Sequence, residues 1–351
     1  MARCIVLAKG VSKIKYIAHF GLHHPVNAGD TLLFHSTREL FDYYFGDQHW
    51  KLFNIRDQMT SAKAEELNEN AKAIVIGGGG MIADKGFESG WQFNCSLELL
   101  EQIKVPIIVF GIGYNLFRGQ ELSEKAKEHL TATAKQAAFF GVREKETVRL
   151  LKEITGADIA YQPCPTAILS KFYPLPDVEP TRIGFNWAGD GMESRIGAKK
   201  GRKEKIESLF RELQKALPNN IDLTQHLRGD NTAWKYLDGN RIDLHLAPPK
   251  TIINYYTQVE LNIGMRLHSQ LIPFGLGNGF IGLESHPKVG RALTDLHFED
   301  RLVNLKSDNL SEELQKIIEE FDYVKTGERI EKEKEDLWDL TLFNLAELKN
   351  I

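Results

Sequence analysis

We predict a junction between a strand and a helix at Gly264-Met265-Arg266-Leu267-His268-Ser269. Residues 259–263 before it alternate as a half-buried strand does, and residues 270–275 after it favour a short helix or turn. The first turn of a helix offers free N–H groups and the positive end of the helix dipole. Arg266 can hold a phosphate or carboxylate through two hydrogen bonds, and His268 can gain or lose a proton near neutral pH. The junction therefore predicts an anion site with a proton donor, although the pattern alone also fits an arginine paired with a surface carboxylate and a packed histidine.

Three earlier segments repeat this arrangement of an apolar strand that ends in glycine or arginine. They are residues 73–80, which end in four glycines, residues 106–113, which end in Gly-Ile-Gly, and residues 137–143, which end in Arg143. Strands and helices that alternate in this way are typical of a doubly wound parallel sheet, whose ligand loops lie at the carboxyl ends of the strands. At the N-terminus we expect a strand over residues 4–8. A loop over residues 19–30 would follow, and then a helix over residues 31–45 that is capped by Asp30.

The second half of the chain begins after a proline-rich linker. Residues 173–180 contain three prolines in eight positions, and a second series of strands and helices follows. We predict an N-terminal α/β domain over residues 1–172, a C-terminal α/β domain over residues 173–315 and C-terminal helices over residues 316–351. Packing of these helices on the first domain is left open. The architecture is two facing, Rossmann-like α/β domains with a ligand cleft between them. The other predicted elements are helices over residues 123–136, 144–154, 202–217, 249–256, 311–321 and 332–349, and strands over residues 182–187, 242–246 and 279–283.

The composition is that of an ordinary globular protein. The 351 residues are 42% apolar and 26% charged, and the net charge of −4 gives no field that favours nucleic acid. No stretch approaches the ~20 apolar residues of a transmembrane helix. The three cysteines, Cys4, Cys95 and Cys164, are too widely spaced for a metal motif or a disulfide framework. We therefore expect a cytoplasmic protein, and a peripheral position at the inner face of a membrane is left open.

Familiar nucleotide and metal motifs do not occur in the sequence. The glycines at 77–80 do not form G-x-G-x-x-G, which argues against an NAD site, and no P-loop pattern is present. His19, His23 and His24 are clustered, but adjacent histidines point apart in a strand, so a polar substrate loop is favoured over a zinc site. We predict no metal site and no cofactor.

Basic residues at the predicted strand ends favour a small anion with several charges. Arg143, Arg266, His268 and Lys288 all follow predicted strands in a chain that is acidic overall. For Arg143, the spacing fits an ordinary surface position at the start of a helix equally well.

Five pieces of the chain, in order over roughly residues 25–295, resemble the polysaccharide pyruvyl transferase family. They are Asn27-Ala28-Gly29-Asp30, Gly77-Gly78-Gly79, Gly111-Ile112-Gly113, Val142-Arg143-Glu144, and residues 256–288 with Arg266-Leu267-His268-Ser269 at their centre and Lys288 at their end. Many relatives carry Asp-Pro before the linker, whereas this chain has Cys164-Pro165. We expect that difference to alter a loop contact and to leave the donor site intact.

The resemblance implies a GT-B-like fold, with phosphoenolpyruvate as donor and a sugar or glycan as acceptor. It implies that Arg143 and Arg266 bind the phosphate and carboxylate of the donor and that His268 is the catalytic acid. A lipid-linked acceptor and a homo-oligomer are left open. The expected substrate-binding residues are Arg143, Arg266, Lys288, Asn27, Asp30, Gly78, Gly79, Gly113, Asn115, Leu267 and Ser269.

The chemistry of the residues fits this reaction. A histidinium can protonate the methylene carbon of an enolpyruvate, and a dianionic phosphate beside it would keep the ring charged. Arginines would stabilise the leaving phosphate while two sugar hydroxyls attack in turn. Asp30, His23 and Asp84 are candidates for the base that accepts the hydroxyl proton.

Two other functions remain open from the sequence. On the same fold, a nucleotide-sugar glycosyltransferase would hold a diphosphate with Arg266 and Lys288 and a ribose with Glu284. A carbohydrate-binding or regulatory protein without activity is the non-enzymatic alternative, against which the presence of both arginines and the histidine argues. Thermal stabilisation by phosphoenolpyruvate, by nucleotide diphosphates or by sugar alone distinguishes the three functions.

Overall fold

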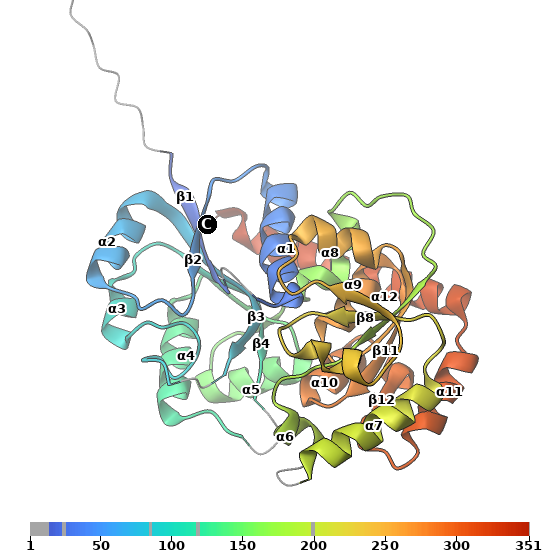
Figure 1. The fold of residues 1–351 in the computed structure, drawn as a ribbon. Coiled ribbons are helices and arrows are strands. Elements are labelled where there is room, and N and C mark those ends of the chain that lie inside the picture. Colours follow the sequence, from blue (N-terminus) through green and yellow to red (C-terminus); the bar gives the residue numbers. More distant parts are fainter. Residues whose placement is uncertain (1–13, 23–25, 84–85, 117–119, 198–200, 351) are drawn as a thin grey trace, which may run out of the picture.

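The computed structural model describes residues 14–22, 26–83, 86–116, 120–197 and 201–350. Two six-stranded parallel sheets form two lobes that lie side by side (Figure 1). The first sheet contains β1 (Tyr16–Gly21), β2 (Trp50–Asn54), β3 (Ala71–Ile82), β4 (Ile107–Tyr114), β5 (Phe139–Val142) and β6 (Ala160–Tyr161). The second contains β7 (Arg182–Asn186), β8 (Asp222–Gln225), β9 (Asn240–Asp243), β10 (Val259–Gly264), β11 (Gly279–Glu284) and β12 (Leu302–Asn304).

Each sheet reverses its strand order at one place. The spatial order is β2-β1-β3-β4-β5-β6 in the first sheet and β12-β11-β10-β7-β8-β9 in the second. The reversal falls between β1 and β3 in the first sheet and between β7 and β10 in the second. A crevice opens at such a switch point outside the carboxyl ends of the strands, and ligands of α/β proteins bind there. The predicted pair of doubly wound α/β units is confirmed.

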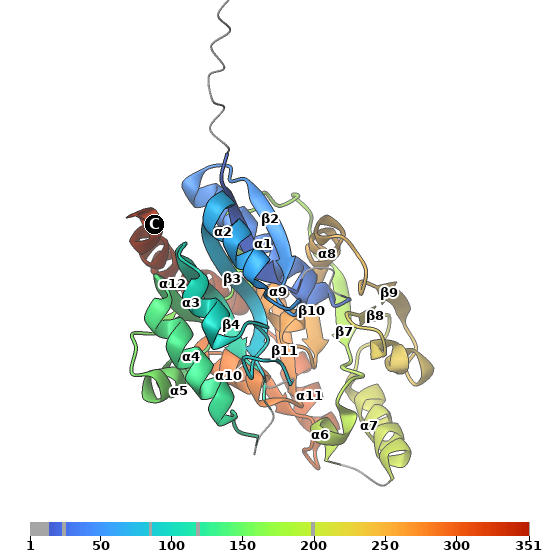
Figure 2. The same cartoon turned by 90° about the vertical axis from the view of Figure 1, so that its left-hand side faces the viewer.

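Helices cover the faces of both sheets (Figures 1 and 2). Around the first sheet they are α1 (Ala28–Phe45), α2 (Ser61–Asn70), α3 (Leu97–Gln102), α4 (Glu124–Gln136) and α5 (Lys145–Thr155). The later helices are α6 (Met192–Ile196), α7 (Arg202–Ala216), α8 (Pro249–Tyr256), α9 (His268–Leu276), α10 (Pro287–Asp295), α11 (Leu310–Glu319) and α12 (Tyr323–Glu347). Short 3-10 helices are η1 (Pro165–Lys171), η2 (Asp230–Lys235), η3 (Glu299–Arg301) and η4 (Leu348–Asn350).

The start of the chain differs from the prediction. The strand expected over residues 4–8 lies outside the described residues, and part of the segment expected to be a loop is the strand β1. All six residues of β1 are buried, and it pairs with β2 on one side and β3 on the other. His19 interrupts its apolar run, but the ring packs 4.0 Å from that of Phe34 and is fully buried. Because a polar histidine interrupts the apolar run, the sequence pattern did not predict this strand.

The cap of α1 also differs from the prediction. The helix begins at Ala28, and its cap is Asn27, whose side-chain oxygen accepts a hydrogen bond from the Gly29 amide at 3.0 Å. Asp30 lies in the first turn of the helix instead. Prediction was better for α4, which Ser123 caps, and for α5, whose C-cap is Gly156.

The glycine runs belong to strands and not to loops. β3 continues through residues 77–80 to Ile82, and β4 continues through Gly113 to Tyr114. Gly78 and Gly79 have φ angles of 75° and 106°, and the pairing with β4 shifts register after Gly79. Only glycine adopts such angles readily, so the strand can bend at this position.

Three further differences concern the second half and the unpredicted elements. β9 begins and ends earlier than the strand expected over residues 242–246, and α12 begins nine residues before the predicted position of 332. Gly327 weakens the helical pattern there, but it lies inside α12, which Asp322 caps. Elements that the sequence did not predict are β2, β6, β8, β12, α2, α3, α6 and α10.

An apolar cluster joins the helices between the two sheets. It includes Leu32 of α1, Ile168 of η1, Ile252 of α8, Leu271 of α9 and Leu337 of α12, all buried. The side-chain amide of Asn344 in α12 also donates to the carbonyl of Tyr161 in β6, so the C-terminal helix reaches the first lobe. The predicted domain boundaries stay predictions. Among the described residues, no helix combines the length and apolarity that crossing a bilayer requires.

Candidate functional site

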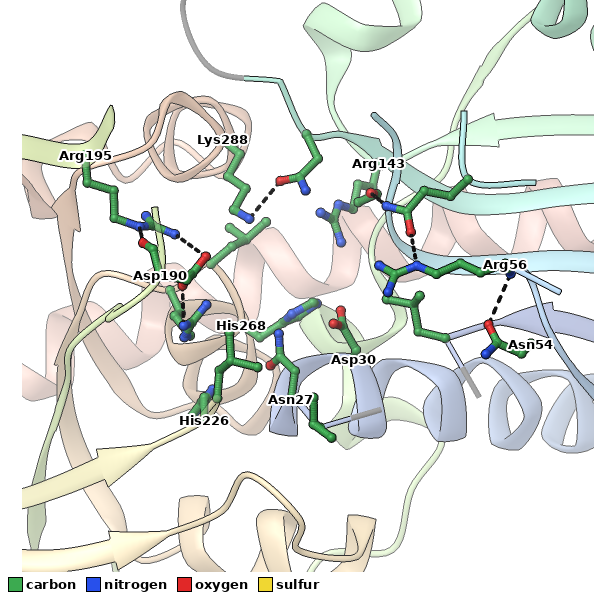
Figure 3. A pocket seen from close by; sticks show the side chains of 18 residues that line it. Asn27, Asp30, Asn54, Arg56, Arg143, Asp190, Arg195, His226, His268 and Lys288 are labelled. Atoms are coloured by element: carbon green, nitrogen blue, oxygen red, sulfur yellow. Dashed lines mark hydrogen bonds and ion pairs between the residues drawn. The ribbon is translucent and has the colours of Figure 1, made fainter. Parts of the chain in front are cut away.

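The two switch points open into one pocket. Its volume is about 350 Å³, and it receives residues that follow β1 and β3 in the first sheet and β7 and β10 in the second. Five cationic side chains line it, against two carboxylates. The lining residues are Leu22, Val26, Asn27, Asp30, Asn54, Arg56, Gly80, Gln92, Asn115, Arg143, Asp190, Arg195, His226, Leu227, Arg266, Leu267, His268 and Lys288. Figure 3 shows the charged groups converging from both lobes.

Arg266 follows β10, and two carboxylates hold its side chain. Its Nε and Nη2 donate to both oxygens of Asp230 at 2.7 and 2.6 Å, and Nη2 also donates to Asp190. The side chain of Asp230 is fully buried and accepts further backbone N–H bonds from Gly189, His226 and Leu227. Nη1 is thus the one guanidinium nitrogen of Arg266 without a partner among the described residues. The two guanidinium N–H groups of Arg266 that were predicted to bind a ligand bind Asp230 instead. This pairing fixes the direction of Nη1.

A second ion pair, on the side of the pocket that the second sheet forms, involves Arg195 and Asp190. Arg195 is 2% exposed, and it donates to the carbonyl of Asp190 at 2.7 Å and to the hydroxyl of Ser285 at 2.9 Å. Burial raises the pKa of Asp190, but Arg266 and Arg195 outweigh burial and bring that pKa to about 2. Asp190 therefore stays ionised and fixes both arginines.

Arg143, at the end of β5, reaches the pocket from the first lobe. Its Nε donates to Glu144 at 3.0 Å, while the buried Nη1 has no hydrogen-bond partner among the described residues. A Cβ on Gly113 would lie 2.4 Å from Nε of Arg143, so only glycine leaves room for the side chain to cross β4. A buried guanidinium N–H without a partner is costly, and a ligand oxygen in the pocket would satisfy it.

Lys288 in α10 carries a strongly shifted pKa. Its Nζ donates to the side-chain oxygen of Asn115 at 3.0 Å. Burial, together with repulsion from Arg195, Arg143 and Arg266, lowers the pKa of Lys288 to about 7. Lys288 can therefore gain or lose a proton near neutral pH, and a bound anion would favour the charged form.

His268 is the first residue of α9, and it packs against the first turn of α1. A Cβ on Gly29 would lie 2.4 Å from Nδ1 of His268, which explains the glycine at that position. Burial lowers the pKa of His268 well below its usual range, and repulsion from Arg143 and Lys288 adds to the shift. The imidazole is thus neutral at pH 7 in this pocket. A multiply charged anion beside it is needed before it can act as an acid, which agrees with the expected role of a donor phosphate.

Cys164 lies beneath His268. The thiol Sγ is 3.9 Å from Nε2 of the imidazole, and both side chains are buried. The cysteine thus contacts a predicted site residue as well as a loop, and the expectation that the donor site stays intact remains a prediction. The 3-10 helix η1, which follows Cys164, packs directly on α9.

Asp30 lies in the first turn of α1 at the centre of the pocket. Burial raises its pKa, although Lys288, Arg143, Arg266 and Arg56 pull in the opposite direction. A carboxylate with a raised pKa, surrounded by cations, can accept a proton from a hydroxyl group. Of the three candidate bases, His23 and Asp84 lie outside the described residues, as does His24 of the histidine cluster.

The structure brings together eight of the twelve predicted site residues. Asn27, Asp30, Asn115, Arg143, Arg266, Leu267, His268 and Lys288 line the pocket. Gly78, Gly79, Gly113 and Ser269 do not line it. Gly78 and Gly79 bend β3, Gly113 makes room for Arg143, and the hydroxyl of Ser269 donates to the Arg266 carbonyl at 2.7 Å. These four residues shape the strands and the helix start that position the others.

Sequence reasoning missed a second group of site residues. Arg56, Asp190, Arg195 and His226 line the pocket, and Asp230 anchors Arg266 from behind. Asp190 had a signal, because Gly-Asp-Gly at 189–191 follows the strand-like residues 182–187. Glu284, the residue assigned to a ribose, lines a neighbouring pocket with Ser285, His286 and Lys306.

The fold and pocket define a class of protein, a GT-B-like pair of facing Rossmann-like units with a cationic pocket at their switch points. The family model for polysaccharide pyruvyl transferase matches residues 27–287, and the chain therefore belongs to the polysaccharide pyruvyl transferase family. A search of curated protein sequences gives no match.

Solved structures share the fold at low sequence identity. A putative UDP-N-acetylglucosamine 2-epimerase from Listeria monocytogenes is 14% identical, with 92% of this chain and 91% of that chain covered and a TM-score of 0.52. MnaA from S. aureus, in a co-structure with UDP, is 10% identical, with 90% of each chain covered and a TM-score of 0.51. The UDP-GlcNAc 2-epimerase from Neisseria meningitidis bound to UDP-GlcNAc is 12% identical, with 90% of this chain and 94% of that chain covered and a TM-score of 0.50. At these identities the likeness shows the GT-B-like fold alone.

Proposed function

We propose that this protein transfers pyruvate from phosphoenolpyruvate to a sugar of a polysaccharide or glycan precursor, forming a pyruvyl ketal and releasing phosphate. The observation that supports it is the convergence of Arg143, Lys288 and His268 on one pocket. The unpartnered Nη1 of Arg143 and the ammonium of Lys288 suit the phosphate and carboxylate of the donor. Arg266, held by Asp230, offers Nη1 to the same anion.

The reaction begins with protonation of the donor at carbon. The dianionic phosphate offsets the positive field that keeps His268 neutral, so the imidazole gains a proton. His268 passes that proton to the methylene carbon, which becomes a methyl group, and C2 becomes an oxocarbenium-like centre. One sugar hydroxyl attacks C2, and Asp30 accepts its proton.

A second hydroxyl group completes the ketal. Its oxygen bonds to C2 as the C2–O bond to phosphate breaks, and the guanidinium groups of Arg143 and Arg266 stabilise the leaving charge. Of the two hydroxyl protons, one replaces the proton that His268 gave to carbon, and the other leaves with the phosphate. The steps are proton transfers and a substitution, so we propose that they use no redox cofactor and no metal.

A coupled assay tests the proposal. Phosphate release from phosphoenolpyruvate is measured against a panel of glycans, with a chelator present and absent, and the products are checked by mass for the pyruvyl ketal. We expect phosphate release only with a suitable glycan and no effect of the chelator. We also expect phosphoenolpyruvate, and not UDP, to raise the melting temperature. Stabilisation by UDP alone would favour the nucleotide-sugar glycosyltransferase and refute the proposal.

A further inference from the structure

The end of the pocket farthest from the second sheet carries a fixed arginine. Arg56 follows β2, and its backbone N–H donates to the side-chain oxygen of Asn54 at 3.1 Å, while its carbonyl accepts from Asn94 at 3.0 Å. Its Nε donates to Gln92 at 2.9 Å, and Gln92 is only 3% exposed. These bonds hold the backbone and the guanidinium in place. Figure 3 shows the guanidinium directed into the pocket on the side of Asp30.

Three hydrogen bonds and one close packing contact connect Arg56 to Lys288 along the pocket. The amide of Gln92 donates to the carbonyl of Gly80 at 2.8 Å. Gly80 lies against Asn115, because a Cβ on it would be 2.8 Å from Cβ of Asn115, and Asn115 accepts from Lys288. Arg56 and Lys288 thus mark the two ends of one continuous wall. Asp30 lines the same pocket, where burial raises its pKa and the charges of Lys288 and Arg56 lower it.

Arg56 forms no ion pair with a carboxylate in the part of the chain that the structure describes. By contrast, Arg143 has Glu144, Arg195 has Asp190, and Arg266 has Asp190 and Asp230. Its Nη1 and Nη2 have no partner there either. A guanidinium that is held by its Nε and directs both terminal nitrogens into a pocket is arranged to bind two oxygens of an anion.

We infer that Arg56 binds an anionic group of the acceptor, a phosphate ester or a carboxylate, so that the acceptor is a charged sugar. The inference rests on the proposed function, which places the phosphate and carboxylate of the donor at Arg143, Lys288 and Arg266. An acceptor anchored at Arg56 extends toward Lys288 and brings a hydroxyl group to Asp30. Because Arg56 binds this anionic group, the protein should bind charged sugars more tightly than neutral ones of the same stereochemistry.

Calorimetry with paired sugars tests this inference. The donor site is first filled with phospholactate, a saturated analogue of phosphoenolpyruvate that cannot be protonated at carbon. Galactose, mannose and N-acetylglucosamine are then each compared with their 1-phosphates, and galactose with galacturonic acid, in wild type and in Arg56→Gln. We expect at least one charged sugar to bind wild type about tenfold more tightly than its neutral partner, and Arg56→Gln to abolish that preference. The arms with phosphate and carboxylate identify the anion.

Two control variants and the binding of phospholactate show whether a loss of the preference is specific to Arg56. Arg211→Gln removes an equal charge from the exposed face of α7 and should retain the preference, and Arg56→Lys should retain part of it. Phospholactate should bind Arg56→Gln as it binds wild type. The inference is overturned if charged sugars bind no better than neutral ones, if the preference survives in Arg56→Gln, or if that variant loses phospholactate. Failure of wild type to bind phospholactate refutes the proposed function instead, and the sugar pairs are then compared with inorganic phosphate in its place.

Discussion

The two walls of the pocket handle positive charge in different ways. On the wall from the second sheet, Asp190 and Asp230 hold Arg195 and Arg266, and Asp230 is itself fixed by three backbone N–H groups. On the wall from the first sheet, Arg143 leaves Nη1 unpartnered and Arg56 has no acidic partner among the described residues. The second wall is therefore preorganised before a ligand arrives, whereas the first wall keeps guanidinium N–H groups available to a ligand.

His268 connects the two walls, and its replacement gives the largest expected effect. It belongs to the second wall in sequence but packs on Gly29 of the first. His268→Gln keeps the size and one hydrogen bond but removes the titratable proton. We expect turnover to fall by ~10²–10⁴-fold, the usual contribution of a general acid, with donor affinity retained. Single-turnover rate, donor affinity and melting temperature are measured on one preparation.

Solvent-isotope incorporation serves as the control for that variant. In D₂O, wild type should place deuterium in the methyl group of the product. A folded His268→Gln protein with a near-normal single-turnover rate would show that the imidazole is a packing residue, and both the acid role and the connection between the walls would be lost.

The two central arginines provide the most direct test of the difference between the walls. Arg143→Lys keeps the charge but loses the planar fork, so the donor should bind roughly tenfold more weakly, an effect of ~1.4 kcal/mol, with little change in melting temperature. Arg266→Lys breaks at least one of three bonds to buried or partly buried carboxylates. It should destabilise the protein by ~1–2 kcal/mol and weaken donor binding less. Calorimetry and denaturant unfolding measure the two quantities, and equal losses of both in the two variants would contradict the comparison.

The sequence predicted the site residues that lie in local motifs and missed those that meet only through the fold. Arg266 and His268 were found because one strand-to-helix junction carries both, and Arg143 because it ends a strand. Asp230 is 36 residues from Arg266 and meets it only because β8 and β10 both lie next to β7 in the second sheet. Local patterns carry no information on such a pairing. Arg56 follows β2, which the sequence did not predict, so nothing placed that arginine at a strand end.

The pKa of Lys288 predicts how donor binding depends on pH. Lys288 is protonated below its pKa of about 7 and neutral above it. An anion binds the protonated form better, so donor affinity should fall several-fold between pH 7 and pH 8. Since Arg stays charged throughout this range, Lys288→Arg should flatten the profile above pH 7. The phosphate of the donor titrates near pH 6 and affects both proteins equally, so the ratio of their dissociation constants isolates Lys288. A constant ratio from pH 6 to pH 9 would contradict this assignment.

The smallest expected effect is at Cys164, under the point where the walls meet. Its thiol is 3.9 Å from Nε2 of His268, but burial and the charges of Arg143 and Lys288 are what lower the pKa of the imidazole. Burial also raises the pKa of the thiol, so a neutral group faces the ring. Cys164→Ser keeps a neutral group of similar size and should change turnover by less than about threefold, with the pH profile unmoved. The matched variant Cys95→Ser removes the other thiol that is buried among the described residues, and it gives the cost of burying a hydroxyl group away from His268. A larger loss of turnover in Cys164→Ser than in Cys95→Ser, at equal stability, would show that the thiol itself positions His268.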